Sequence, residues 1–425
     1  MIGDKIYDLA VKLYPINRSL TGNGVRETLE ILKEIVPFLH VSEIPSGTAC
    51  FDWNVPQEWN VKDAYVKDAN GTKVIDFKKH NLHLMGYSEP IHTKMPLVEL
   101  QKHLRSIADY PEAIPYVTSY YKRDWGFCLS HNEREKLQEG EYEVFIDSEL
   151  KDGSLTYGEI LIKGESEEEI LLSTYICHPS MANNELSGPT VSIHLARWLL
   201  ELPRRYSYRI LFIPETIGSI CYLSRHYKEM QNNIIAGFVL TCIGDEGDYS
   251  YLASIDGDTL ADEVAQHVLS HIDKDYKKYS FLQRGSDERQ YCSPGIDLPV
   301  VDLMRTKYGH YKEYHTSKDD LSVISPKGLE GGYEMVKKVL EALENNHVYK
   351  TTVLCEPQLG KRGLYPTQYF KSPGEYVFTM RNVIAYSNGK RTLLEIAQKI
   401  NKPIWELYGI VQRLMEEKIL LCVGD

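Results

Sequence analysis

The chain has 425 residues, of which 43% are hydrophobic and 25% charged, and its formal net charge is −12. This length predicts two or three domains, and the acidic balance argues against general binding to nucleic acid or to an anionic membrane. No apolar stretch is long enough to span a bilayer, no signal core opens the chain, and the eight cysteines form no CxxC pair, so we expect a cytoplasmic protein with reduced thiols.

The chain begins with two segments of helical periodicity within residues 1–40, joined by a polar loop. From 41 to 130, short β-like pieces alternate with turn residues such as Asn70-Gly71. This pattern of short strands and turns predicts an inserted β-rich domain with little helix.

Strands and helices then alternate over residues 131–350. Such alternation predicts an α/β domain whose mostly parallel sheet is covered by helices on both faces. The predicted strands are Tyr142–Ile146, Glu159–Ile162, Glu169–Ile176, Tyr208–Ile213, Ile234–Thr241, Tyr249–Ala253 and Leu298–Leu303, and the predicted helices are Gly188–Leu202, Thr216–Glu229, Leu260–Ser270 and Lys327–Asn345.

Residues 360–425 are expected to form a separate unit after a Pro- and Gly-containing linker. Two apolar-periodic helices, Thr392–Ile400 and Pro403–Glu416, precede a strand at Ile419–Val423, an order typical of a winged helix. The second helix carries several glutamates and few basic residues, which favours docking to a protein over binding to DNA.

The segment with the clearest chemical character follows the apolar strand Glu169–Ile176. His178 ends that strand, and Asn184 lies six residues later, before a Ser-Gly helix entry. A histidine and an oxygen ligand at the carboxyl edge of an α/β sheet suit a metal site. The alternative is a histidine satisfied within the core.

Two further positions share this edge. Glu215 follows the strand Tyr208–Ile213 and precedes a helix, where a carboxylate can serve as metal ligand or general base, or can interact with the helix dipole. His315 follows the last predicted strand and opens a Thr-Ser-Lys-Asp turn, and on its own it indicates little.

Together these segments resemble, in order, the co-catalytic zinc aminopeptidases, which are leucyl-aminopeptidase-like zinc exopeptidases. Those enzymes carry HxD, GxxDNxSG, a glutamate pair, DMxG and a late YHTxxD. The insert and the winged helix are similar to those of a bacterial aminopeptidase-like family. The resemblance covers about residues 1–40 and 131–350 and implies a three-layer core. The matching segments are His178, Asn183–Gly188, Glu215, Ile243-Gly244, Gly285–Tyr291, Gly295–Pro299 and Tyr314–Asp319.

The resemblance implies a zinc site in which His178 is the first ligand and His315 the last. Asn184 matches the carboxylate that bridges two metals, and Glu215 matches the glutamate pair. In that family a metal-held water loses its proton to a glutamate, so Glu215 is the expected catalytic base.

Several family carboxylates are replaced in this chain. Ser180 stands for the aspartate of HxD, Thr241 for that of DMxG, and Asn184 is a neutral and poorer bridge between two cations. We therefore expect one zinc ion, at a site centred on Glu215, His315 and an oxygen of Asn184 or of another acidic residue, with two ions as the alternative. Carboxylates that could replace or support the lost ligands are Glu185, Asp245, Asp287 and Glu288, each of which alone is more typical of a solvated group.

The expected function is metal-dependent hydrolysis of an N-terminal peptide bond or a related small amide. The alternative is a non-catalytic binding or assembly protein that keeps the exopeptidase scaffold and docks a protein through its winged helix. We expect neither a membrane nor nucleic acid as a partner, and the sequence leaves a homo-oligomer open. The expected domains are 1–40 and 131–350 for the core, 41–130 for the insert and 360–425 for the winged helix.

Overall fold

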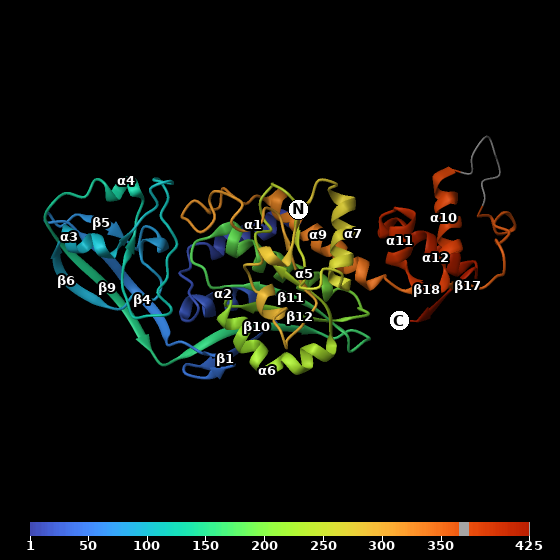
Figure 1. Ribbon diagram of the computed structural model, residues 1–425, viewed down its shortest axis with the longest axis horizontal. Helices are drawn as coiled ribbons and strands as arrows, with labels where there is room; N and C mark the ends of the chain where they lie inside the picture. The colour runs from blue at the N-terminus through green and yellow to red at the C-terminus, as the bar shows by residue number, and fades with distance from the viewer. Residues whose placement is uncertain (365–373, 425) are drawn as a thin grey trace. The chain divides into compact units, whose positions relative to one another are not determined.

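The computed structural model describes residues 1–364 and 374–424 (Figure 1). The chain divides into two compact units, which are described in turn. The first comprises Met1–Ala261 with Lys277–Glu334, and the second comprises Asp262–Tyr276 with Met335–Asp425.

An eight-stranded sheet forms the centre of the first unit, in the order β1-β10-β12-β11-β13-β16-β14-β15. Its four central strands, β12, β11, β13 and β16, pair in parallel, and every residue of β11 and β12 is buried. Strands buried on both faces need apolar residues throughout, which explains the unbroken apolar runs in the sequence. The strands are β1 (His40–Pro45), β10 (Ser154–Ile162), β11 (Glu169–Tyr175), β12 (Ser207–Ile213), β13 (Ile234–Leu240), β14 (Ser250–Leu252), β15 (Lys277–Tyr279) and β16 (Val300–Met304).

Helices cover this sheet, and Figure 1 shows α5 and α6 on opposite sides of its central strands. Helix α5 packs on β11, β12 and β13 and is itself covered by α1 and α2. The predicted α/β fold with a mostly parallel central sheet is therefore confirmed. The helices are α1 (Ile2–Leu13), α2 (Asn23–Ile35), α5 (Ser187–Leu199), α6 (Ile217–Asn233) and the short α8 (Glu288–Tyr291).

The insert contains a four-stranded antiparallel sheet in the order β5-β4-β9-β6. Strand β9 was expected in the core sheet from its segment Tyr142–Ile146, but it pairs with β4 and β6 instead. Its alternating burial is typical of a half-buried antiparallel strand, and this period does not indicate which sheet a strand joins. The insert elements are β2 (Ala49–Cys50), β3 (Trp53–Asn54), β4 (Glu58–Lys67), β5 (Lys73–Asp76), β6 (Ile91–Pro96), α3 (Leu97–Leu100), β7 (Leu104–Arg105), β8 (Phe127–Cys128), α4 (His131–Arg134) and β9 (Glu141–Lys151).

The second unit contains the predicted winged helix. Helix α11 begins at a capping box in which Thr392 and Glu395 satisfy each other's backbone N–H groups. The expected helix Pro403–Glu416 is a 3₁₀ turn at Ile404–Glu406 followed by α12, a common way for a helix to begin. The elements are α7 (Leu260–Ile272) and α9 (Pro326–Glu344), each of which spans both units, β17 (Val348–Thr351), α10 (Gly374–Tyr386), β18 (Asn388–Thr392), α11 (Leu393–Ile400), α12 (Tyr408–Glu416) and β19 (Leu420–Gly424).

Strands β18, β17 and β19 form a three-stranded antiparallel sheet beside these helices. The sequence patterns did not identify β17 or β18, because short half-exposed strands carry a weak apolar period. Helix α10 was not predicted either. Within residues 1–364 and 374–424, no helix has both the length and the apolar character that crossing a membrane requires.

Candidate active site

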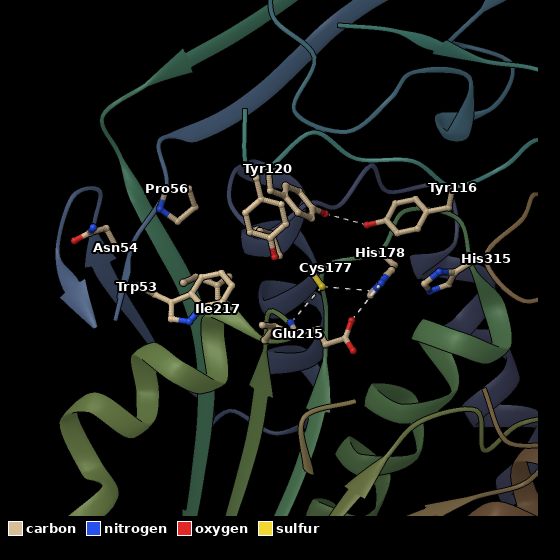
Figure 2. Close-up of a pocket in the computed structure, with 13 residues that line it drawn as sticks. Trp53, Asn54, Pro56, Tyr116, Tyr120, Cys177, His178, Glu215, Ile217 and His315 are labelled. Carbon is tan, nitrogen blue, oxygen red and sulfur yellow. Dashed lines mark hydrogen bonds and ion pairs between the residues drawn. The ribbon is translucent and has the colours of Figure 1, made fainter. Parts of the chain in front are cut away.

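A cavity of about 290 Å³ opens at the carboxyl ends of the central parallel strands (Figure 2). His178 follows β11, Glu215 follows β12, and His315 lies in the loop after β16. The parallel topology therefore brings together three residues that are distant in the sequence. The complete lining is Leu20, Trp53, Asn54, Pro56, Tyr116, Tyr120, Tyr121, Cys177, His178, Glu215, Thr216, Ile217 and His315.

His178 is held by a buried carboxylate. Its Nδ1 lies 2.7 Å from Oε2 of Glu185, whose side chain is fully buried. Glu185 belongs to a single π-helical turn, Ala182–Leu186, which leads into α5. When Glu185 is ionised, Nδ1–H donates to it and Nε2 keeps a lone pair. That Nε2 lies 3.5 Å from Oε2 of Glu215 at the cavity.

Arg18 supports this pair from the N-terminal loop. Its Nε donates to the carbonyl of His178 at 3.0 Å and lies 3.8 Å from Oε1 of Glu185. Burial and the charge of Arg18 lower the pKa of His178 to about 3, so the imidazole is neutral near pH 7. Burial raises the pKa of Glu185 to about 8, and the Arg18 charge opposes that rise.

The ring centroid of His315 lies 5.5 Å from that of His178. The ring of Tyr314 stacks on His315 with 3.9 Å between the centroids. His315 has a positive φ of 56°, and its carbonyl accepts the N–H of Tyr116 at 2.9 Å, which fixes the loop. Burial lowers the pKa of His315 to about 3, with a contribution from His178. Both imidazoles therefore offer neutral nitrogen lone pairs.

Glu215 is the carboxylate at the cavity, with a side chain that is 20% exposed. Burial, together with the neighbouring carboxylate of Asp287, raises its pKa well above the ordinary value. Two imidazoles and one carboxylate are the donor set of many catalytic zinc sites. By donor type these residues suit one zinc ion, but their three ligand atoms do not all lie within 4.8 Å of one another in this structure and would have to draw closer to hold it.

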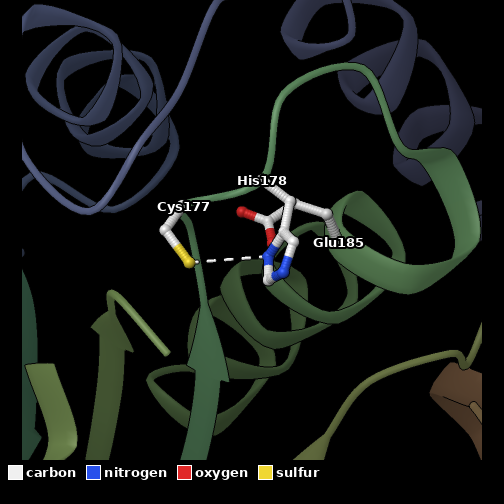
Figure 3. A group of neighbouring side chains, drawn as sticks. All are labelled: Cys177, His178 and Glu185. Atoms are coloured by element: carbon white, nitrogen blue, oxygen red, sulfur yellow. Dashed lines mark hydrogen bonds and ion pairs between the residues drawn. The ribbon is translucent and has the colours of Figure 1, made fainter. Parts of the chain in front are cut away.

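Cys177, His178 and Glu185 form a second group whose ligand atoms lie within 4.8 Å of one another (Figure 3). This group is a poorer metal site, because Nδ1 of His178 is already bonded to Glu185. Burial also raises the pKa of the Cys177 thiol well above its ordinary value, which disfavours the thiolate that a metal would bind.

Asn184 lies in a closed hydrogen-bond network away from the described cavity lining. Its side-chain Nδ2 donates to the hydroxyl of Tyr175 at 3.1 Å, and its backbone carbonyl accepts from Thr241 Oγ1 at 2.9 Å. The hydroxyls of Tyr175 and Thr241 also bond to each other. Within residues 1–364 and 374–424, Asn184 Oδ1 is buried and has no hydrogen-bond partner. The positions that match the second metal site of the zinc aminopeptidases are therefore bonded to one another.

Asp245 stabilises loops near the site. Its carboxylate accepts hydrogen bonds from Thr306 Oγ1 at 2.6 Å and from the backbone of Gly247 at 2.7 Å. Asp319, for which no role was predicted, accepts the N–H groups of Asn183 and Asn184 at 2.7 and 2.9 Å. Asp319 thereby fixes the turn that carries Glu185; its signal in the sequence was the last position of the YHTxxD resemblance.

Asp287 and Glu288 lie behind the cavity wall and are fully buried. Asp287 Oδ1 accepts the N–H of Thr216 at 2.7 Å and so holds the strand-end turn, in which Thr216 has a positive φ of 64°. Glu288 accepts the N–H of Gly285 at 2.7 Å. Among the described residues, neither carboxylate contributes to the cavity lining.

Comparison with known proteins identifies a family for most of the chain. Residues 7–346 match the family described as "Domain of unknown function (DUF4910)". The chain belongs to this family. Residues 347–422 match a winged helix-turn-helix family, in agreement with the fold of the second unit.

A Clostridium acetobutylicum protein described as a "Putative polysaccharide biosynthesis protein with aminopeptidase-like domain" is 49% identical over 401 residues, which is 93% of this DUF4910 chain and 91% of the relative. A crystal structure of a "putative peptidase" from the same organism is 47% identical, with a TM-score of 0.93 over 99% of this chain and 96% of that one.

The zinc aminopeptidase BSAP from Bacillus subtilis has a TM-score of 0.57 at 13% identity, over 80% of this chain and 94% of that one. At this identity the likeness shows a shared fold. The expected kinship with the zinc aminopeptidases is thus confirmed for the architecture of the core.

Proposed function

We propose that this DUF4910 protein hydrolyses an N-terminal peptide bond or a related small amide with one bound zinc ion. The observation that carries the proposal is the convergence of His178, Glu215 and His315 on one cavity, with Nε2 of His178 3.5 Å from the Glu215 carboxylate. His178, His315 and Glu215 would hold the ion.

Zinc, when bound, acidifies a water molecule and polarises the carbonyl of the scissile amide. The proton transfers would be carried out by a side chain of the protein. Glu215 is the carboxylate of the cavity lining, where it would take a proton from water and return it to the leaving nitrogen, and burial with the neighbouring Asp287 raises its pKa towards that of a general base. One of its oxygens would contact the metal, and the other is then the proton acceptor.

A single metal is the stoichiometry that the site supports best. Asn184 and Thr241 match positions that carry aspartates in the zinc aminopeptidases, and here they offer neutral groups engaged with Tyr175. Neutral amide and hydroxyl oxygens compensate the charge of a second Zn²⁺ poorly.

The same network favours a second candidate function, a non-catalytic binding or assembly protein on the exopeptidase scaffold with its winged helix as the docking module. A non-catalytic scaffold holds no metal ion, so it needs no negatively charged side chain at the positions of Asn184 and Thr241. The two candidates differ in turnover. The description of the 49% identical relative also makes sugar-borne amides a class to test beside peptides.

The test compares the zinc-loaded chain with Glu215→Gln on a panel of aminoacyl anilides and N-acyl amines. Glu215→Gln should lower turnover by roughly 10²–10⁴-fold or more while the circular dichroism spectrum and thermal unfolding are unchanged. Glu201→Gln, at an exposed position outside the cavity lining, is the matched control and should keep full activity. Equal turnover in Glu215→Gln and the wild type would contradict the assignment.

A further inference from the structure

The wall of the cavity that faces the three site residues is aromatic. Trp53 comes from the β2–β3 hairpin, and Tyr116, Tyr120 and Tyr121 come from the loop that precedes β8 (Figure 2). The hydroxyls of Tyr116 and Tyr120 are 3.0 Å apart, and the rings of Trp53 and Tyr121 lie 6.0 Å apart. The insert thus supplies a surface of ring faces with polar tips.

The described lining contains no lysine or arginine and a single carboxylate, that of Glu215. A substrate with a free N-terminal ammonium needs an anionic partner, since an unpaired charge is costly to bury. The nearby carboxylates do not serve this purpose. Asp287 and Glu185 are fully buried behind the wall and do not line the cavity, although one oxygen of each has no hydrogen-bond partner among the described residues. When Glu215 holds the metal, the lining therefore offers an ammonium no carboxylate of its own, and the cavity suits an uncharged group.

The polar tips argue against a purely apolar side chain as the occupant. Tyrosine and tryptophan present an apolar face and a hydrogen-bonding edge, and Asn54 adds an amide at the same wall. A pyranose ring has the complementary pattern, with C–H groups on its faces and hydroxyls around its rim. A volume of about 290 Å³ is near the lower limit of roughly 300 Å³ for ligand pockets, which is room for one ring and a short acyl group.

We propose that the amide is carried on a sugar ring, so that the substrate is an N-acylated amino sugar rather than a peptide with a free N-terminus. The hydrolytic step rests on the proposed function. In that step the oxygen of water bonds to the acyl carbon, the C–N bond breaks, and the amine nitrogen takes the proton, which gives a carboxylate and the amino sugar. The ring packs on Trp53 and the tyrosines while the acyl group faces Glu215.

Binding is measured first, so that recognition is tested without turnover. Full-length wild type stripped of zinc, which gives no turnover, and Glu215→Gln with and without one equivalent of zinc are titrated with the methyl glycoside of N-acetylglucosamine and with leucinamide by calorimetry and saturation-transfer NMR. The glycoside should bind saturably and leucinamide should not. Trp53→Ala should weaken glycoside binding about tenfold, the scale of one aromatic contact.

Phe51→Ala is the matched control, because Phe51 lies on the same hairpin, is 55% exposed and does not line the cavity. Tyr121→Phe, at a position that is 80% exposed, removes a hydroxyl without risk to folding and should also weaken glycoside binding. If leucinamide binds in preference, or if Trp53→Ala and Tyr121→Phe bind the glycoside like Phe51→Ala, the inference is wrong.

Acetate release by the zinc-loaded wild type then separates this inference from the proposed function. Release of acetate from the glycoside, without cleavage of leucine p-nitroanilide, supports both the sugar substrate and the hydrolase function. Cleavage of the anilide alone overturns the sugar assignment and leaves the hydrolase. Glycoside binding that depends on Trp53, with no amide cleaved, overturns the hydrolase and upholds recognition of the sugar.

Discussion

Glu185 Oε2 lies 2.7 Å from Nδ1 of His178, so the histidine is oriented by a carboxylate seven residues further along the chain. In the HxD pattern of the zinc aminopeptidases the aspartate stands two residues after the histidine, where this chain has Ser180. Ser180 instead donates to the carbonyl of Tyr14 at 3.2 Å. The π-helical turn thus supplies a carboxylate beside His178 that the strand-end loop lacks.

Glu185→Gln should weaken zinc binding by about 10–100-fold, the usual effect of removing a carboxylate that orients a metal-binding histidine. Glutamine keeps a hydrogen-bond acceptor for Nδ1–H but cannot take the negative charge that Glu185 carries when it is ionised. Competition with a chromophoric chelator measures the affinity, and Glu201→Gln is the exposed control. Unchanged zinc affinity in Glu185→Gln would show that Glu185 does not support the metal site.

Restoring two carboxylates should create a second metal site. Asn184→Asp combined with Thr241→Asp should raise zinc from one to two equivalents per chain, because each change supplies a charge that the family pattern carries. Without zinc the double variant should unfold at a lower temperature than the wild type, since Asp319 already contacts the backbone of Asn184 at 2.9 Å and like charges would lie close together. A stoichiometry that stays at one would contradict this account of the lost site.

The contact between α2 and the insert should be sensitive to acid. Arg26 bonds to both oxygens of Glu58 at 2.8 and 2.6 Å and lowers the pKa of Glu58 to about 2. The ordinary value is 4.5, so this contribution to stability is complete above about pH 4.5 and is lost as the pH falls towards 2.

Arg26→Met should therefore lower the free energy of unfolding by about 1–2 kcal/mol near neutral pH, after allowance for the partial exposure of Arg26. The difference from the wild type should shrink as the pH approaches 2. Urea unfolding at several pH values measures it. Arg123→Met, which removes an exposed ion pair with Glu89, should cost under about 1 kcal/mol. If the loss of unfolding free energy in Arg26→Met does not change with pH, the loss comes from packing and not from the ion pair with Glu58.

The sequence predicted the strand-end positions of the site because buried parallel strands have a distinctive apolar run. His178 and Glu215 follow β11 and β12, and parallel neighbours place both at one edge. The orientation of the side chains was harder to predict from the sequence. Asn184 and Glu185 are adjacent in sequence, and only the geometry of the π-helical turn decides that Glu185 meets His178.

Contacts between distant segments were not predictable from local patterns. Arg18 belongs to an N-terminal loop, yet it bonds to the carbonyl of His178. The aromatic wall uses Trp53, Tyr116 and Tyr120 from an insert whose position over the core depends on long-range packing. Among 30 tyrosines spread along the chain, no spacing distinguishes those that line the cavity.

The central claim is that His178, Glu215 and His315 bind one zinc ion. The most direct test is the metal content, by mass spectrometry, of protein purified without chelator or metal-affinity resin, beside His315→Ala. The account predicts about one zinc per wild-type chain and its loss in His315→Ala. No bound zinc in the wild type, even after zinc is added back, would contradict the account and favour the binding scaffold.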